Sequence, residues 1–493
     1  MKLRGNDERK QDATSRKGRR QKVKKKLFEW LFGLRGVSLP EGEKVGSFYK
    51  QMLIVAWPAA LEGMLVSLMN SFDTMMVGKI GPVAIAAVGL CAQPRMILLL
   101  LVQAVCVGTT SVIARRRGEE RQDAAVSCLK QSLFLVTCLG ILITAAGFFL
   151  ADPFLLLAGA NEETLPDARI YFRIVAMAFI ANCWSLCICA AQRGIGKTRI
   201  TMITNMIANA VNVTLNYCLI GGHLGFPALG IRGAAIATAI GTCVSCIVAL
   251  IVVLKPGGYL SLPKSGRFRF DKETMSGLVK VGSGTIAESV FLRVGFLISG
   301  RLVAGVSTAA YVSTQIVQQV SGLSFTLGDG VASACTALVG RSMGAKRNDH
   351  ALAYVKVSEK ISLFMSILLI AFIFFLREPL ARLFTDDGEI LAASVLSFIV
   401  LLLGIIPQNL RVVLSGCLRG AGDVRYVALV SLISVAILRP ALTWLFCYPL
   451  NDAFPVLQFG VLGNWLSFGI DALVRAVMLT HRVNRGKWLS IRL

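Results

Sequence analysis

The segment from Gln51 to Gly81 limits the fold of this chain more than any other, because an apolar run there contains two acids. The run is long enough to cross a bilayer, since about 20 residues span a hydrocarbon core of roughly 30 Å. An acidic side chain at the centre of such a helix costs on the order of 3 kcal/mol, so Glu62 and Asp73 are expected to face protein or a water-filled cavity. Their spacing places them on nearly the same helix face, roughly 16 Å apart along the axis.

Pro58 lies one turn before Glu62, where it removes a backbone hydrogen bond and can bend the helix. A bendable membrane helix with two acids on one face favours ion-coupled transport. A static bundle, in which each acid satisfies an arginine or a backbone group, is the alternative.

The composition indicates a polytopic, all-α membrane protein. Of the 493 residues, 55% are hydrophobic and 16% are charged, which a soluble domain does not show. The net charge of +24 lies largely in the first 26 residues and in short loops, so we expect no nucleic-acid partner. After this tail, Leu27, Phe28, Trp30, Leu31 and Leu34 are expected to form a short helix on an anionic membrane surface.

The thirteen cysteines are scattered through apolar segments. The spacings of Cys243 with Cys246, and of Cys183, Cys187 and Cys189, fall inside membrane helices without acidic or histidine partners. We expect buried free thiols and no metal site there.

Twelve membrane spans are predicted from the apolar runs. They lie at about 51–81, 83–114, 124–150, 170–191, 200–220, 234–254, 278–303, 309–339, 355–376, 393–418, 426–448 and 459–480. Basic residues gather in every second loop, on the side of the amino-terminal tail. The positive-inside rule then predicts a cell-membrane protein with both termini in the cytoplasm.

The two halves of the chain repeat each other. Three landmarks recur with one constant difference in numbering (379 − 153, 419 − 193 and 344 − 118 all equal 226), called here the repeat offset. They are Asp152-Pro153, which recurs as Glu378-Pro379, Arg193-Gly194, which recurs as Arg419-Gly420, and Gly118, which recurs as Gly344. Six spans per half is an even number, so both halves enter the membrane in the same orientation. The predicted organisation is a basic cytoplasmic tail (1–46), a six-helix bundle (47–254), a cytoplasmic linker (255–275) and a second six-helix bundle with a short basic tail (276–493).

Several motifs resemble those of the MATE (multidrug and toxic compound extrusion) transporters. They are FDTMMVGKIGPVAIAAVGL after Pro58, NVTLNYCLIGG, the repeated RGIGKTR and RGAGDVR, and VGRSMGAKR. The resemblance extends from about Ser47 to Trp488. It implies a twelve-helix, V-shaped protein that exports amphiphilic, often cationic, compounds in exchange for Na⁺ or H⁺.

The resemblance also implies a cation or proton site in the first bundle. Asp73 matches the family's first-helix aspartate and Pro58 its bending proline. Asn212 matches a fifth-helix asparagine, Asn216 stands where some members carry a second aspartate, and Thr238 matches a sixth-helix hydroxyl. A carboxylate out of water can exchange a proton or bind a cation, and neutral oxygens suit a hard monovalent ion.

In the second bundle, Glu288 resembles the seventh-helix glutamate of one branch of the family. Gln408 stands where some members have a tenth-helix aspartate, so a sodium site in this bundle is not expected to be complete. Glu62 could be a second cation-binding acid or the partner of an arginine such as Arg95, and Arg293 could neutralise Glu288. Asp471 and Arg475, spaced i,i+4, are expected to form a structural pair.

The leading interpretation is a secondary active antiporter, monomeric and without cofactors, for small-molecule substrates. A flippase for a lipid-linked precursor is the first alternative, because Arg95, Arg293, Arg411 and Arg439 could bind a phosphate headgroup. A non-transporting receptor or scaffold is the second, but it leaves the repeat and the acids unexplained. No ATP-binding loop or nucleophile arrangement is present, so we predict no enzymatic activity.

Overall fold

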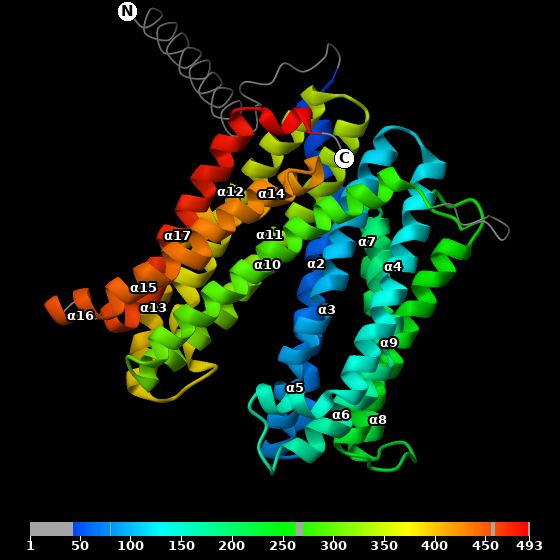
Figure 1. Cartoon of the computed structure of the whole chain (residues 1–493). Helices are drawn as coiled ribbons and strands as arrows, with labels where there is room; N and C mark the ends of the chain where they lie inside the picture. The colour runs from blue at the N-terminus through cyan, green and yellow to red at the C-terminus, as the bar shows by residue number, and fades with distance from the viewer. Residues whose placement is uncertain (1–42, 79, 263–269, 455–458, 492–493) are drawn as a thin grey trace, which may run out of the picture.

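A computed structural model describes residues 43–78, 80–262, 270–454 and 459–491, and this part of the chain is helical without strands (Figure 1). The helices of the N-terminal half are α2 (Val45–Gly78), α3 (Pro82–Gly118), α4 (Gln122–Phe149), α5 (Ala151–Leu157), α6 (Leu165–Met177), α7 (Phe179–Gly194), α8 (Thr198–Gly221) and α9 (Ile231–Leu254). Those of the C-terminal half are α10 (Lys272–Ala304), α11 (Thr308–Gly344), α12 (Asn348–Arg382), α13 (Gly388–Ala421), α14 (Val424–Ser431), η1 (Leu432–Leu438), α15 (Arg439–Cys447), α16 (Pro449–Ala453), α17 (Phe459–Asn484) and η3 (Lys487–Ser490).

The described helices account for the twelve spans that the sequence predicts. By length and hydropathy, nine of them can cross a membrane, and the bent pair α6–α7 makes a tenth. The remaining two long helices are α8 and α10. Neither is apolar enough by the same measure, because α8 carries Asn205, Asn212 and Asn216 and α10 carries Glu288 and Arg293. These two helices hold three of the candidate site residues, Asn212, Asn216 and Glu288.

Two predicted spans are less regular than their apolar patterns indicate. The fourth bends by 52° between α6 and α7, and at this break the N–H of Ala178 bonds to the carbonyl of Val175, three residues back. The eleventh contains the π-helical turn η1 between α14 and α15. Such turns are rare and often mark functional sites.

The two halves cross at the end of the molecule where α2 begins and α17 ends, called here the termini end (Figure 1). There α3 and α11 touch backbone to backbone. A Cβ built on Gly118 would lie 1.9 Å from the carbonyl oxygen of Arg341, and one on Gly344 would lie 2.0 Å from that of Arg115. Away from this crossing the two groups of helices diverge, which gives the V shape.

The internal repeat extends to single hydrogen bonds. Thr110 donates to the carbonyl of Ala190 at 2.9 Å, and Thr336 donates to that of Gly416 at 2.8 Å. Donor and acceptor positions are both related by the repeat offset. Helices α3 and α7 therefore pack as α11 and α13 do.

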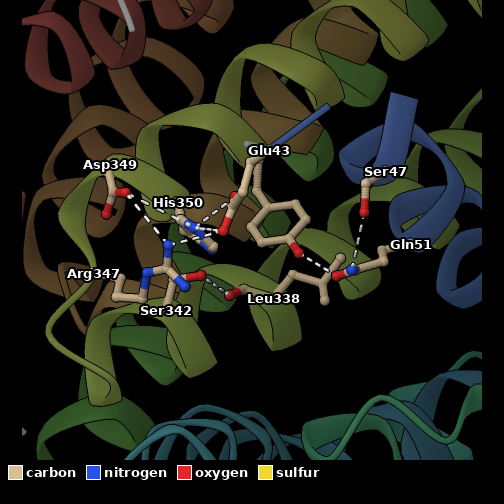
Figure 2. A network of polar contacts seen from close by, with 9 residues as sticks. Glu43, Ser47, Gln51, Leu338, Ser342, Arg347, Asp349 and His350 are labelled. Atoms are coloured by element: carbon tan, nitrogen blue, oxygen red, sulfur yellow. Dashed lines mark hydrogen bonds and ion pairs between the residues drawn. The ribbon is translucent and has the colours of Figure 1, made fainter. Parts of the chain in front are cut away.

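The beginning of α2 packs against the C-terminal half. Phe48, Met52 and Val55 are buried in one apolar cluster with residues of α11, α12 and α13. Figure 2 shows the polar contacts beside this cluster, where Glu43 lies 2.9 Å from both Arg347 and His350. The first helix of the predicted N-terminal bundle thus joins the two halves at the termini end.

The basic tail and the predicted surface helix at 27–34 lie outside the described residues. The thirteen cysteines are free thiols, as expected. Eleven of them are buried, but Cys138 and Cys243 are exposed. The expectation of burial is therefore wrong for Cys243, which lies on an exposed side of α9.

Candidate functional site

The structure brings four of the predicted site residues together near the end opposite the termini. Asp73 on α2 accepts a hydrogen bond from Nδ2 of Asn216 on α8 at 2.8 Å. Turning the Asn212 amide places its nitrogen 2.9 and 3.1 Å from the Asp73 carboxylate oxygens and lets its oxygen accept from the Thr238 N–H at 3.2 Å. Asn212 and Asn216 are buried, while Asp73 and Thr238 are half-buried. Three helices, α2, α8 and α9, therefore build one polar site.

Sequence reasoning missed two neighbours of this site. Tyr171 on α6 is buried, and its hydroxyl interacts with Thr238. Arg95 on α3 interacts electrostatically with Asp73. Tyr171 lies shortly before the bend that ends α6, and no local pattern in the sequence marks its contact with Thr238.

The arrangement suits a single monovalent cation or a proton. It offers one carboxylate, two amides and two hydroxyls, all hard oxygen donors once the amides turn their oxygens inward. Within the described residues, no group of three or more acids, histidines or cysteines is arranged to hold a metal ion. The half-burial of Asp73 leaves the carboxylate reachable from one side.

Glu62 could be a second cation-binding acid or the partner of an arginine such as Arg95, and the structure gives it partners other than Arg95. Its carboxylate accepts from the Thr201 hydroxyl at 2.7 Å and from the Asn205 amide at 2.6 Å, both on α8. Nη1 of Arg193, at the end of α7, lies 3.6 Å away. The suggested pairing with Arg95 is wrong, because Thr201, Asn205 and Arg193 are the partners of this carboxylate.

Glu288 is held by Arg419 and not by its sequence neighbour Arg293. Nε and Nη2 of Arg419 donate to the two carboxylate oxygens at 3.3 and 2.6 Å, which is a bidentate contact. The repeat offset relates Glu62 to Glu288, and it also relates Arg193 to Arg419. This offset is a sequence signal that the two pairs are equivalent, since each arginine belongs to a repeated RG turn, but it does not by itself show that glutamate and arginine meet.

Pro58 is buried within α2, which continues through it without a break. The Thr198 hydroxyl donates to the carbonyl of Val55 at 2.7 Å. Val55 lies in the turn before Pro58, and this turn lacks one backbone hydrogen bond because proline has no N–H. Helix α8 therefore supports α2 where it is most easily bent.

The remaining membrane charges divide into buried and exposed groups. The predicted Asp471–Arg475 pair is confirmed, with Nη2 and Oδ2 2.5 Å apart and both side chains buried. Arg411 and Arg439 are also buried. Asp329 on α11 is exposed and interacts electrostatically with Arg419.

Comparison with known proteins agrees with this architecture. The MatE family model matches the chain twice, over residues 58–218 and 285–445, which reproduces the repeat. A "Probable multidrug resistance protein NorM" of Thermotoga maritima is 28% identical over 454 residues, covering 90% of this chain and 94% of that protein. An "Uncharacterized transporter YisQ" of Bacillus subtilis is 24% identical over 437 residues, covering 88% and 94%.

Solved structures share the fold at low sequence identity. One described as the "Outward-facing conformation of a multidrug resistance MATE family transporter of the MOP superfamily" superposes with a TM-score of 0.82 at 21% identity, over 90% of this chain and 97% of that one. A MOP superfamily transporter from Pyrococcus furiosus gives the same values. The two matches to the family model together cover more than half of the sequence, and the chain therefore belongs to the MatE family.

Proposed function

We propose that this protein is a secondary active exporter of amphiphilic, cationic small molecules, driven by exchange for Na⁺ or H⁺. The observation that carries the proposal is the setting of Asp73. It is a half-buried carboxylate in a membrane helix, surrounded by Asn212, Asn216 and Thr238. Relatives named as multidrug resistance proteins support the export of drugs.

Coupling follows from competition at one carboxylate. With Asp73 ionised, the site attracts a Na⁺ ion, a proton or the positive group of a substrate, and it does not favour two of them together. Entry of the driving cation then expels the substrate. The amides of Asn212 and Asn216 can turn either their N–H groups to the carboxylate or their oxygens to a bound ion.

Alternating access would move the two halves about their crossing at the termini end. Pro58 is the proposed bending point of α2, because proline has no N–H to donate to the preceding turn. In that turn the Val55 carbonyl accepts a hydrogen bond from the Thr198 hydroxyl. We infer that residues 47–254 and 276–493 are the two moving bundles, joined by the linker 255–275, and that both termini are cytoplasmic. We expect a monomer without cofactors or enzymatic activity.

Glu288 and Glu62 are the proposed acids of a second, weaker coupling route. Glu288 is bound by Arg419, and Glu62 is bound by neutral donors with Arg193 nearby. Each carboxylate would have to release its arginine before it could take a cation. Asp73 forms no such ion pair with any residue that the structure describes, so it is the first candidate.

The alternative of a lipid-linked flippase needs arginines that a phosphate headgroup can reach. Arg411 and Arg439 are 7% and 3% exposed, so neither is available to such a headgroup. Arg95 and Arg293 are more exposed but lie on different helices of different halves. This arrangement favours the exporter.

The decisive experiment measures efflux of a cationic dye from proteoliposomes with a Na⁺ gradient and a pH gradient imposed separately. One of the two gradients is expected to drive export, and Asp73→Asn is expected to abolish it. Export that continues without either gradient would contradict the proposal.

A further inference from the structure

Polar contacts join the beginning of α2 to α12 at the termini end (Figure 2). The carboxylate of Glu43, just before α2, lies 2.9 Å from Nη2 of Arg347 and 2.9 Å from Nε2 of His350. Further along α2, Oε1 of Gln51 accepts a hydrogen bond from the Tyr354 hydroxyl. These five residues are called the α2 latch, because they tie the first helix of one half to the other half.

The first helix of the C-terminal half is tied to the N-terminal half in a similar way. Oε1 of Glu273, in the first turn of α10, lies 3.0 Å from Nη2 of Arg116 on α3. Turning the amide of Gln131 on α4 lets its nitrogen donate to the carbonyl of Asp271 at 3.1 Å and its oxygen accept from the Asp271 N–H at 3.0 Å. These four residues are called the α10 latch. Each half therefore extends the beginning of its first helix onto the other.

Both latches lie at the termini end, where α2 and α10 begin (Figure 1). In the proposed function, the bundles that contain α2 and α12 move apart there when this end opens. Glu43 is carried by one moving bundle, and Arg347 and His350 by the other. Opening of the termini end therefore requires the α2 latch to break, which is a step that rests on the proposed alternating access.

Only the α2 latch contains a histidine. The repeat offset relates His350 to Ala124 (350 − 124 = 226), so the equivalent turn of the N-terminal half has no titratable side chain at this position. Histidine changes its charge between about pH 5 and pH 8. The arginine and carboxylates of the α10 latch keep their charges in that range. The two latches therefore differ in their response to protons.

A proton on His350 balances the charges around it. Carboxylate oxygens of Glu43 and Asp349 lie 2.9 and 3.8 Å from its Nε2. Nη2 of Arg347 lies 2.9 Å from Glu43 and 3.8 Å from Asp349. Two carboxylates thus face one guanidinium, and an imidazolium brings the four side chains to a net charge of zero. A neutral imidazole leaves them with one excess negative charge.

The further charged groups at this place do not titrate in the same range. Arg341, in the last turn of α11, interacts electrostatically with Tyr354. Lys44 and Lys346 are exposed. Guanidinium and ammonium groups stay charged, and a tyrosine hydroxyl stays neutral, up to about pH 9. The side chain of His350 is 16% exposed, so protons can reach it while the latch is closed.

We propose that the α2 latch is a proton-sensitive lock on the termini end. Protonated His350 holds Glu43 and keeps this end closed, and loss of the proton as pH rises removes that attraction and favours opening. In the proposed topology this end faces the cytoplasm. Acidification of the cytoplasm would then slow the loading of substrate, whatever ion drives export.

The test measures the distance between two spin labels at the other end of the molecule, in the purified protein without substrate. The labels are placed on Glu162→Cys, between α5 and α6, and on Asp386→Cys, between α12 and α13, both exposed. The exposed thiols Cys138 and Cys243 are replaced by serine, and Asp73→Asn removes the titration of the coupling acid. Opening of the termini end brings the labelled loops together.

A long and a short distance are therefore expected, for the closed and the open termini end. The ratio of short to long is expected to rise about two- to fivefold between pH 6 and pH 8, as for a partly exposed ion pair. A single unchanged distance at every pH, in every variant and after addition of a cationic dye would contradict the alternating movement and the inference together.

Four histidine variants locate the effect. His350→Gln carries no charge at any pH, so it is expected to give the high ratio of pH 8 throughout. His350→Lys stays charged and is expected to give the low ratio of pH 6 throughout. His223→Gln and His481→Gln change the other two histidines of the chain and should keep the full pH response.

Glu273→Gln weakens the α10 latch instead. It is expected to raise the proportion of the short distance at every pH and to leave the pH response in place. If His350→Gln shows the same pH response as the unmodified protein, the proton acts elsewhere and the inference is wrong. A shift of the two distances by dye would still support the proposed function in that case, so the two failures are distinguishable.

Discussion

Glu62 and Glu288 occupy equivalent positions in the two halves, and each carboxylate lies against the arginine of a repeated RG turn. The two pairs differ in strength. Glu288 depends on the bidentate contact with Arg419, whereas Glu62 also accepts from Thr201 and Asn205. Both halves of the duplicated fold therefore have the glutamate and the arginine, but the residues around each pair differ.

This difference predicts unequal effects of removing the two arginines. Arg419→Gln leaves Glu288 buried without a counter-charge and is expected to destabilise the protein by about 3–5 kcal/mol. Arg193→Gln is expected to cost about 1 kcal/mol or less, because both side chains are partly exposed and the neutral donors remain. Thermal unfolding in detergent measures both. The double variant Glu288→Gln, Arg419→Gln should recover most of the loss; no recovery would show that Arg419 acts elsewhere.

Asp73→Asn is expected to abolish gradient-driven efflux while membrane insertion and the unfolding midpoint stay close to normal. The substitution keeps the shape of the side chain but removes the charge on which exchange depends. Asp452→Asn, on an exposed position of α16, is the matched control. Undiminished efflux by Asp73→Asn at a saturating gradient would exclude Asp73 from coupling.

Binding of a cationic dye is expected to weaken as pH falls, because a protonated Asp73 no longer attracts a positive charge. Equilibrium dye binding to the purified protein over a pH series measures this. Asp73→Asn should bind weakly with a flat profile. A profile that is the same in both proteins would place the competing proton on another group.

Pro58→Ala is expected to leave dye affinity nearly unchanged but to slow efflux, since the proline serves the bending of α2 and not the site. Binding and efflux measured on the same preparation separate the two effects. A loss of affinity without a change in turnover would reverse this assignment.

Gly118→Ala and Gly344→Ala are each expected to destabilise the crossing at the termini end by about 1–3 kcal/mol. The added Cβ would lie about 2 Å from a backbone carbonyl oxygen, which cannot move as a flexible side chain does. Gly89→Ala, also in α3, meets no atom within 4 Å and should slightly stabilise the helix. Equal unfolding midpoints for all three would show that the halves are not in close contact there.

Much of the architecture could be predicted from the sequence. Membrane embedding, twelve spans and the duplication follow from long apolar runs and from the constant offset between RG turns, both of which are properties of the chain alone. The grouping of Asp73 with Asn212, Asn216 and Thr238 was also predicted, but through resemblance and not through geometry. The bend at Ala178 and the π-helical turn were not predicted, because their segments are as apolar as regular spans.

The sequence by itself determined which segments cross the membrane and which ionisable residues lie within them, because apolar surface and charge are counted locally along the chain. Only the tertiary structure decided which charges meet. Glu288 pairs with Arg419, 131 positions away, and not with Arg293 on the same helix. The reason is that Coulomb attraction weakens as the distance between two charges grows, and the packing of the helices sets which charges are nearest in space.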